Sequence, residues 1–327
     1  MARNARLTGE MAITETEHHL TLDVVPPFSF AQALSFIGTF YARAYERVPA
    51  SEQVVGKTLR RVVSVRGKPV LFEVEENEGG LELTLYAEEL DDVLVAATVE
   101  RVRFYLGLDD DLTELYRRAD PVFQGVVDEL YGLHMLKVLT PFEAACWALV
   151  QQRTPNAFAH KTMARLAEHF GTKLTHRGVT YTAFPEAAQL LDDPQARVLG
   201  ATNNTRKTER LLHLISAFAG ADETFLRTAP YGEVARWLLN IKGLGAWSVD
   251  FIALRGLGRT ERVPWTDTGL LGAVSRVYTQ GFDISTPRAR ELAERYGWSA
   301  GLWAYYVKTA AYGRERRREA EQETASR

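Results

Sequence analysis

The sequence contains one cysteine, no long apolar run and almost no net charge. Cys146 is the single cysteine among 327 residues and lies in an apolar segment with helical spacing, so we interpret it as a small core residue. One cysteine cannot ligate a four-cysteine iron–sulfur cluster, which excludes proteins that carry such a cluster. The seven histidines have no carboxylate or cysteine partner at metal-ligand spacing, so we expect no side-chain metal site.

Long apolar segments are missing as well. No stretch reaches the ~20 apolar residues of a membrane span, and residues 1–20 lack the unbroken apolar core of a secretion signal. We therefore expect a cytoplasmic protein without a membrane partner. The formal net charge of -3 is not that of an obvious nucleic-acid-binding protein. Net charge averages over all faces, however, so a protein that holds DNA through backbone N–H groups and a local patch can be neutral overall.

The hydrophobic pattern changes its period once along the chain. Alternation predicts antiparallel strands with one exposed face at 18–25, 60–65, 69–76 and 81–88. After Asp91 the period is helical, with segments at 99–106, 113–116, 142–152, 158–170, 208–219, 231–239, 247–257, 270–277 and 287–296. This indicates an α+β fold that is mainly α, with an N-terminal antiparallel sheet. The charged end RERRREAEQETASR predicts a frayed tail.

Two glycines between two helical segments form the most informative motif. Residues 238–257 read LLNIKGLGAWSVDFIALRGL, and in KGLG the residues Gly243 and Gly245 allow a tight turn and a close backbone approach. The N–H groups at the start of the next helix suit a phosphate oxygen. The plainer interpretation is that both glycines only separate two helices. Apolar flanks such as Leu244 and Val249 favour the first interpretation, because they would pack the helices together with the hairpin exposed.

This segment, followed by VPWTDTGLLGAV, resembles the helix-hairpin-helix DNA glycosylase superfamily, and within it the 3-methyladenine DNA glycosylase II type. Other segments are similar to the family in the same order: LTLDVVPPFSFAQALSF (20–36), TPFEAACWALVQQRT (140–154) and RARELAERYGWSAGLWAYYVKTA (288–310). The resemblance covers the chain from about residue 18 to about residue 312.

The resemblance implies that Asp267 is the catalytic carboxylate. Breaking the bond between a base and deoxyribose builds positive charge on the sugar, and a buried carboxylate beside C1′ stabilises that charge and orients the attacking water. The simpler role for Asp267 is to cap the helix that follows it. One residue can serve both roles.

The family's base pocket falls on four aromatic residues. The resemblance places it on Phe36, Trp247, Phe251 and Trp298, although YGWSAGLWAYY also permits a shifted match at the last position. A base flipped out of the duplex needs such faces, and alkylated purines that carry a positive charge stack well on them. Ordinary core packing is the alternative explanation for each aromatic residue.

Several other residues are implied to contact DNA. Gln151 matches the family's minor-groove glutamine, Gln152 falls where relatives carry an apolar wedge, and Arg153 adds a phosphate or base contact. The hairpin adds Lys242, Gly243, Gly245 and Ser248. The alternative for the 151–153 segment is ordinary surface polarity at a helix end.

The resemblance also implies the architecture. We expect an α/β domain at 1–112, a helical domain at 138–258 that ends in the helix-hairpin-helix, and a discontinuous helical domain at 113–137 and 259–327 that carries Asp267. A DNA-binding cleft would lie between the two helical domains. In this superfamily hairpin carbonyls hold a monovalent cation, here those of Leu239, Ile241 and Leu244, and no organic cofactor is implied.

The predicted function is a monofunctional DNA glycosylase that acts as a monomer on damaged double-stranded DNA. It would excise 3-methyladenine, 7-methylguanine and related bases by hydrolysis, as a step of base excision repair. Trp247 occupies the position where relatives with added lyase activity carry a nucleophilic lysine, so no lyase activity is expected. Two alternatives are a noncatalytic helix-hairpin-helix damage sensor and an oxidised-guanine glycosylase of the same superfamily.

Overall fold

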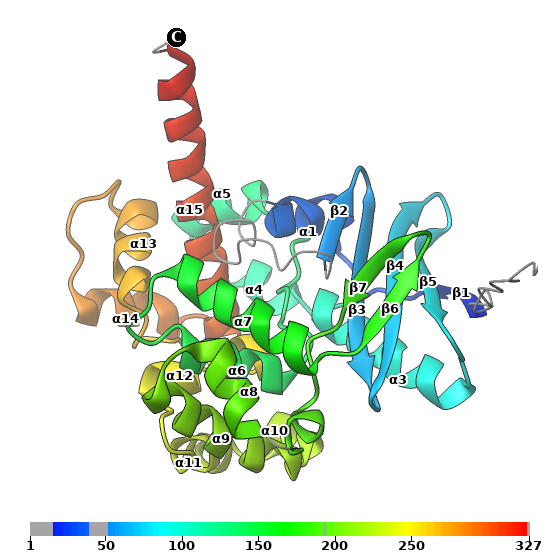
Figure 1. The fold of residues 1–327 in the computed structure, drawn as a ribbon. Helices are drawn as coiled ribbons and strands as arrows, with labels where there is room; N and C mark the ends of the chain where they lie inside the picture. Colours follow the sequence, from blue (N-terminus) through cyan, green and yellow to red (C-terminus); the bar gives the residue numbers. More distant parts are fainter. Residues whose placement is uncertain (1–15, 39–51, 193, 326–327) are drawn as a thin grey trace, which may run out of the picture.

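The computed structural model describes residues 16–38, 52–192 and 194–325, in which a small sheet lies beside a larger helical body (Figure 1). The strands are β1 (Thr16–Leu22), β2 (Glu52–Val55), β3 (Thr58–Val65), β4 (Lys68–Asn77), β5 (Gly80–Ala87), β6 (Lys173–His176) and β7 (Val179–Thr182). None of the described helices is both long enough and apolar enough to cross a membrane.

The helices account for most of the chain after β5. They are α1 (Phe30–Phe36), α3 (Asp92–Leu106), α4 (Thr113–Arg117), α5 (Pro121–Glu129), α6 (Pro141–Val150), α7 (Asn156–Phe170), α8 (Pro194–Thr202), α9 (Thr205–Ala219), α10 (Glu223–Thr228), α11 (Tyr231–Leu239), α12 (Ala246–Phe251), α13 (Thr268–Tyr278), α14 (Thr286–Glu294) and α15 (Ala300–Ala325). A π-helical turn at Ile252–Gly256 continues α12, and short 3-10 turns lie at Ala187–Leu190 and Gly297–Ser299.

The sheet is antiparallel in the order β1-β5-β4-β3-β2, which confirms the predicted sheet. Its predicted exposed face is partly covered. Val62, Leu71 and Tyr86 are neighbours in register, and the β6–β7 hairpin packs on them through Leu174 and Tyr181. The covering hairpin comes from a distant part of the chain, so the alternation within the sheet could not reveal it.

Two large clusters of buried apolar side chains form the core. One joins the other face of the sheet to helices near both ends of the described chain, and it includes Phe72, Tyr105 and Trp303. The second extends from Phe142 to Leu257 and belongs to the central helices. The domain boundaries given above remain predictions.

A buried carboxylate joins the helices of the C-terminal region. Asp120 caps α5 by accepting the amide of Phe123, and it also accepts the hydroxyls of Tyr278 (2.9 Å) and Tyr296 (3.0 Å). The Trp303 indole donates to the Tyr278 hydroxyl in turn. Burial alone would raise the pKa of Asp120, but these hydrogen bonds outweigh it and hold the pKa below its usual value. The network therefore links α5, α13, the turn before α15 and α15 itself.

The charged C-terminal segment is helical, which corrects the predicted frayed tail. α15 continues through it to Ala325, and Figure 1 shows this part extending away from the body. Arg314 and Arg317 both pair with the Glu129 carboxylate at the end of α5. Arginine, glutamate and alanine are good helix formers, so a polar helix can extend from an anchored first half.

The start of α15 lies directly on the loop that precedes Asp267. The Gly301 amide donates to the Thr260 carbonyl at 2.7 Å. A Cβ at Gly301 would lie 2.7 Å from that oxygen and 2.9 Å from the Arg262 carbonyl oxygen. Only glycine permits this approach without a shift of backbone.

We predict that Gly301→Ala destabilises the protein by about 1–3 kcal/mol, because the added methyl group forces α15 and the loop apart. Gly125→Ala is the control, since Gly125 lies in α5 with no atom within 4 Å of a built Cβ. The free energies of unfolding in urea measure both effects. Equal stabilities of the two variants would contradict the close approach.

Candidate active site

The predicted helix, glycine hairpin and helix are present. α11 and α12 are joined by a turn in which Gly243 has φ +107° and Gly245 is extended at the N-cap of α12. Leu244 and Val249 are buried, as their apolar character predicts, while Gly245 is exposed. The amides at the start of α12 are therefore presented at an exposed turn.

The end of α6 is tied to this hairpin by Gln152. Its Nε2 donates to the Gly243 carbonyl (2.8 Å) and to Ser248 Oγ (3.0 Å), and Arg210 donates to its Oε1 (3.4 Å). We expected Gln152 and Ser248 to face DNA. In the structure Ser248 is 1% exposed, and Gln152 holds the hairpin because its Nε2 donates to both Ser248 Oγ and the Gly243 carbonyl.

Arg153 follows Gln152 and is exposed. Its backbone is left-handed, with φ +52°, which ends α6 and its following turn. Gln151 is half-buried and donates to the Asn156 side chain at 3.0 Å. Lys242 is exposed in the hairpin. Arg153 and Lys242 thus present charge to solvent.

A cavity of about 600 Å³ lies where the predicted site residues converge. One wall comes from the end of α6 and from α12, and the other from the loop before α13 and from α15. Trp247 and Phe251 line it and stack on each other, with ring centroids 5.6 Å apart and planes 20° apart. The predicted DNA-facing residues that line it are Gln151, Gln152 and Arg153.

Asp267 lines the cavity and caps α13. Its Oδ1 accepts the Gly269 amide at 2.9 Å, and its Oδ2 accepts a hydrogen bond from the Lys308 ammonium. The carboxylate is 25% exposed, so it is shielded but reachable from the cavity. Both roles considered for Asp267 are therefore geometrically compatible.

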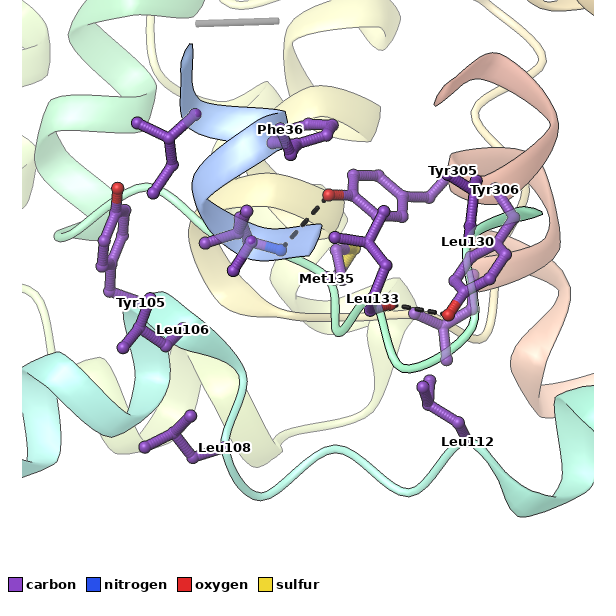
Figure 2. Close-up of a cluster of buried hydrophobic side chains, with 14 of the residues drawn as sticks. Phe36, Tyr105, Leu106, Leu108, Leu112, Leu130, Leu133, Met135, Tyr305 and Tyr306 are labelled. Atoms are coloured by element: carbon purple, nitrogen blue, oxygen red, sulfur yellow. Dashed lines mark hydrogen bonds between the residues drawn. The ribbon is translucent and has the colours of Figure 1, made fainter. Parts of the chain in front are cut away.

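The other two predicted pocket aromatics lie outside this cavity. Trp298 is 82% exposed in the turn before α15. Phe36 is buried and packs on Tyr305, with ring centroids 5.3 Å apart; Figure 2 shows the two rings side by side. Tyr305 itself lines the cavity, and its hydroxyl accepts the Leu136 amide at 3.4 Å. The aromatic-rich segment thus contributes Tyr305 to the cavity, and Phe36 contacts the Tyr305 ring.

Several cavity residues were not predicted, and four of them carry a charge or an indole ring. Trp147, Asp250, Arg255 and Lys308 line the cavity. The helical period carried signals for two of them, because Trp147 is one turn before Gln151 and Lys308 interrupts the mostly apolar first half of α15. No sequence pattern pairs Lys308 with a carboxylate 41 positions earlier.

Asp250 joins the hairpin region to the loop before Asp267. It accepts hydroxyls from Thr266 and, at 3.4 Å, from Tyr231. Burial and the neighbouring Asp250 carboxylate raise the pKa of Tyr231 to about 12, so this hydroxyl stays protonated. Asp250 is therefore engaged in positioning the loop. Within the described residues, no group of three or more His, Cys, Asp or Glu could hold a metal ion.

We compared the sequence and the fold with those of known proteins. No family model matches the chain. A DNA-3-methyladenine glycosylase of Bacillus subtilis (strain 168) is 24% identical over 180 residues, 54% of this chain and 59% of that protein. The chain thus spans less than two thirds of the length of this relative.

Solved structures match over more of the chain. A 3-methyladenine DNA glycosylase from Archaeoglobus fulgidus has a TM-score of 0.74 and 22% identity, covering 90% of this chain and 98% of that one. A Clostridium acetobutylicum 8-oxoguanine glycosylase/lyase in complex with double-stranded DNA has a TM-score of 0.62 and 19% identity, covering 83% and 89%. The chain has the fold of the helix-hairpin-helix DNA glycosylases. Within that class its sequence resembles the 3-methyladenine DNA glycosylases, which confirms the resemblance described above.

We predict that alanine at the two hairpin glycines has different effects on stability. Gly243→Ala should lower stability by about 1 kcal/mol or more, because φ is positive and a Cβ would lie 2.8 Å from the Arg210 side chain. Gly245→Ala should leave stability unchanged, since its φ is -116° and no atom lies within 4 Å.

In both variants the added methyl group should keep a DNA phosphate away from a backbone amide. Loss of one hydrogen bond to a charged phosphate should weaken binding of damaged and undamaged duplexes roughly tenfold. Thermal unfolding and fluorescence anisotropy with the two duplexes measure stability and affinity separately. A change confined to lesion preference would instead assign the hairpin to the base pocket.

Proposed function

We propose that this protein is a monofunctional DNA glycosylase that hydrolyses the N-glycosidic bond of alkylated bases in damaged double-stranded DNA. Its substrates would include 3-methyladenine and 7-methylguanine, and it would act as a monomer in base excision repair. The observation that carries the proposal is the Asp267 carboxylate in a cavity bordered by the Trp247–Phe251 stack. The resemblance to 3-methyladenine DNA glycosylases supports the substrate class.

The cavity suits a nucleotide that has left the duplex. An enzyme cannot reach the glycosidic bond of a stacked base, so the base must enter a pocket. Trp247, Phe251 and Tyr305 provide aromatic faces there, and electron-deficient purines stack on such faces. Selectivity would come partly from the weakened glycosidic bond of the lesion.

Asp267 would act when the sugar lies beside it. As the bond from C1′ to the base breaks, the base takes the electron pair and the sugar becomes cationic. A carboxylate fixed by the Gly269 amide stabilises that cation without reorganising, and it orients the water that attacks C1′. The helix cap is therefore part of the mechanism, since it fixes one carboxylate oxygen.

The hairpin would hold the DNA backbone nearby. The amides at the start of α12 would donate to a phosphate, and the exposed Lys242 would add a charge contact. Because Gln152 is engaged by the hairpin, Arg153 is the residue of this pair that is better placed to contact the opened duplex.

A monovalent cation at the hairpin belongs to the proposal. Leu239, Ile241 and Leu244 belong to the segment that runs from the end of α11 into the turn, and carbonyl oxygens are ligands that fit a hard cation. The turn is already closed by the Leu244 amide, which donates to the Ile241 carbonyl at 3.1 Å. The cation would add stiffness and positive charge beside the phosphate. No organic cofactor is proposed.

Two other functions fit the fold less well. A noncatalytic damage sensor would not need a carboxylate in the cavity. The family resemblance implies that oxidised-guanine glycosylases carry a lysine just after the hairpin, where this chain has Trp247. Both alternatives remain outcomes of the experiments below.

We predict that Asp267→Asn lowers excision of 3-methyladenine at least ~10²-fold, because it removes the charge that stabilises the transition state. Binding of lesion DNA should be kept, since asparagine also caps helices. Asp222→Asn is the matched control, because Asp222 caps α10 in the same way. Excision is measured in single turnover. If Asp267→Asn excised the base at the wild-type rate, Asp267 would not be catalytic. If the wild-type protein excised no base, the noncatalytic damage sensor would be favoured.

We also predict that the enzyme stops at the abasic site. A Schiff base needs a neutral amine at C1′. Trp247 offers none, and the Lys308 amine is held by Asp267. Borohydride should therefore trap no protein–DNA adduct, and strand breaks should require hot alkali. A trapped band that disappears in Lys308→Met or in Lys242→Ala would show that the enzyme is bifunctional and would identify the lysine.

A further inference from the structure

The lysine beside Asp267 gives the cavity an unexpected charge balance. Lys308 lies on α15, lines the cavity and donates to Asp267 Oδ2, with its side chain 33% exposed. Arg153 and Arg255 also line the cavity, and they face only two carboxylates, Asp250 and Asp267. Among the described lining residues, cationic side chains therefore outnumber anionic ones.

Arg153 is exposed to solvent, and the other two charged lining residues, Arg255 and Asp250, contact other groups. Arg255 is 8% exposed, donates to the Leu136 carbonyl at 3.0 Å and lies 5.6 Å from the centre of the Tyr305 ring. Asp250 accepts two hydroxyl groups. Lys308 is thus the cation that lies directly against the proposed catalytic carboxylate.

A cation at this point has opposite effects on two classes of lesion. A base methylated at N3 or N7 is cationic in DNA and leaves as a neutral molecule. A nearby ammonium repels this cationic base before the reaction, and it does not stabilise the neutral base that leaves. An uncharged lesion, such as a deaminated purine, takes the electron pair of the broken bond and leaves with negative charge. An ammonium beside it stabilises that charge.

We propose that Lys308 is the hydrogen-bond donor to the departing base and adapts this cavity to uncharged lesions. The inference rests on the glycosylase function proposed above and specifies its substrate class. The bond from C1′ to the base nitrogen breaks, its electron pair goes to the base, and Lys308 gives that base a proton. The water oxygen forms the new bond to C1′. The proton that the water loses passes through Asp267 to Lys308, which restores the ion pair.

A purely positional role for Lys308 makes a different prediction. If Lys308 only orients Asp267, its removal weakens stabilisation of the sugar cation, and this cation forms with every substrate. Release of charged and uncharged bases would then fall in proportion. The ratio of the two rates separates the two roles.

The experiment compares single-turnover release of hypoxanthine and of 7-methylguanine from otherwise identical duplexes. We expect Lys308→Met to lower hypoxanthine release by at least ~10²-fold, the lower end of the range for loss of a proton donor. Release of 7-methylguanine should fall less than release of hypoxanthine, because this cationic base leaves as a neutral molecule and needs no proton. Lys308→Arg, which keeps the positive charge and donors, should retain most of the hypoxanthine activity. Lys161→Met on α7 is the control, because this lysine is exposed and outside the cavity.

The outcomes separate this inference from the proposed function. Release of both bases with an unchanged ratio in Lys308→Met, or release of 7-methylguanine alone by the wild type, would overturn the inference and leave the glycosylase function intact. Release of neither base nor of 3-methyladenine by the wild type would overturn both. Circular dichroism of each variant shows that it is folded, and the arginine variant tests the charge without loss of side-chain volume.

Discussion

The contact between Asp267 and Lys308 joins the two parts of the chain that build one side of the cavity. Asp267 starts α13 as its cap, whereas Lys308 lies 41 positions later in α15. The contact requires the loop before Asp267 to lie against the first turn of α15, and Gly301 permits this by leaving space for two carbonyl groups. The carboxylate that the proposed reaction needs is therefore fixed by a backbone amide, a side-chain cation and a close helix–loop contact together.

The opposite side of the cavity depends on backbone geometry more than on charge. Gly243 takes a left-handed conformation that permits the turn, and Gln152 fixes the turn from below by donating to its carbonyl. A phosphate clamp made of amides needs no cluster of lysines, which is why a chain with a net charge of -3 can be proposed to bind DNA. Trp247 lies in the first turn of α12, so one short segment supplies both the proposed phosphate clamp and an aromatic wall of the cavity.

The sequence predicted the features that are local and missed those that depend on tertiary contacts. Alternation predicted β1, β3, β4 and β5 but not β2 or the β6–β7 hairpin. The glycine spacing predicted the α11–α12 hairpin, and Trp247 and Phe251 line the cavity beside it. Trp298 and Phe36 were expected in the cavity because aromatic residues are recognisable by type, but only the helical phase of α15 shows that Tyr305 points inward. Ser248 and Gln152 have the polarity of DNA-facing residues, yet they pair with each other. The covered face of the sheet and the Lys308 contact involve partners that are far away in sequence.

The same fold supports different chemistry because the reacting groups can be changed without altering the framework. The Clostridium neighbour is a glycosylase/lyase with a TM-score of 0.62 to this chain. Here the position of a hairpin lysine is taken by Trp247, which gives a stacking surface and removes an amine. Lys308 on α15 brings an amine into the same cavity, where it is held against the Asp267 carboxylate and is proposed to give its proton to the departing base. The proposed role of this lysine is therefore that of a proton donor, whereas the family resemblance assigns a hairpin lysine the role of nucleophile.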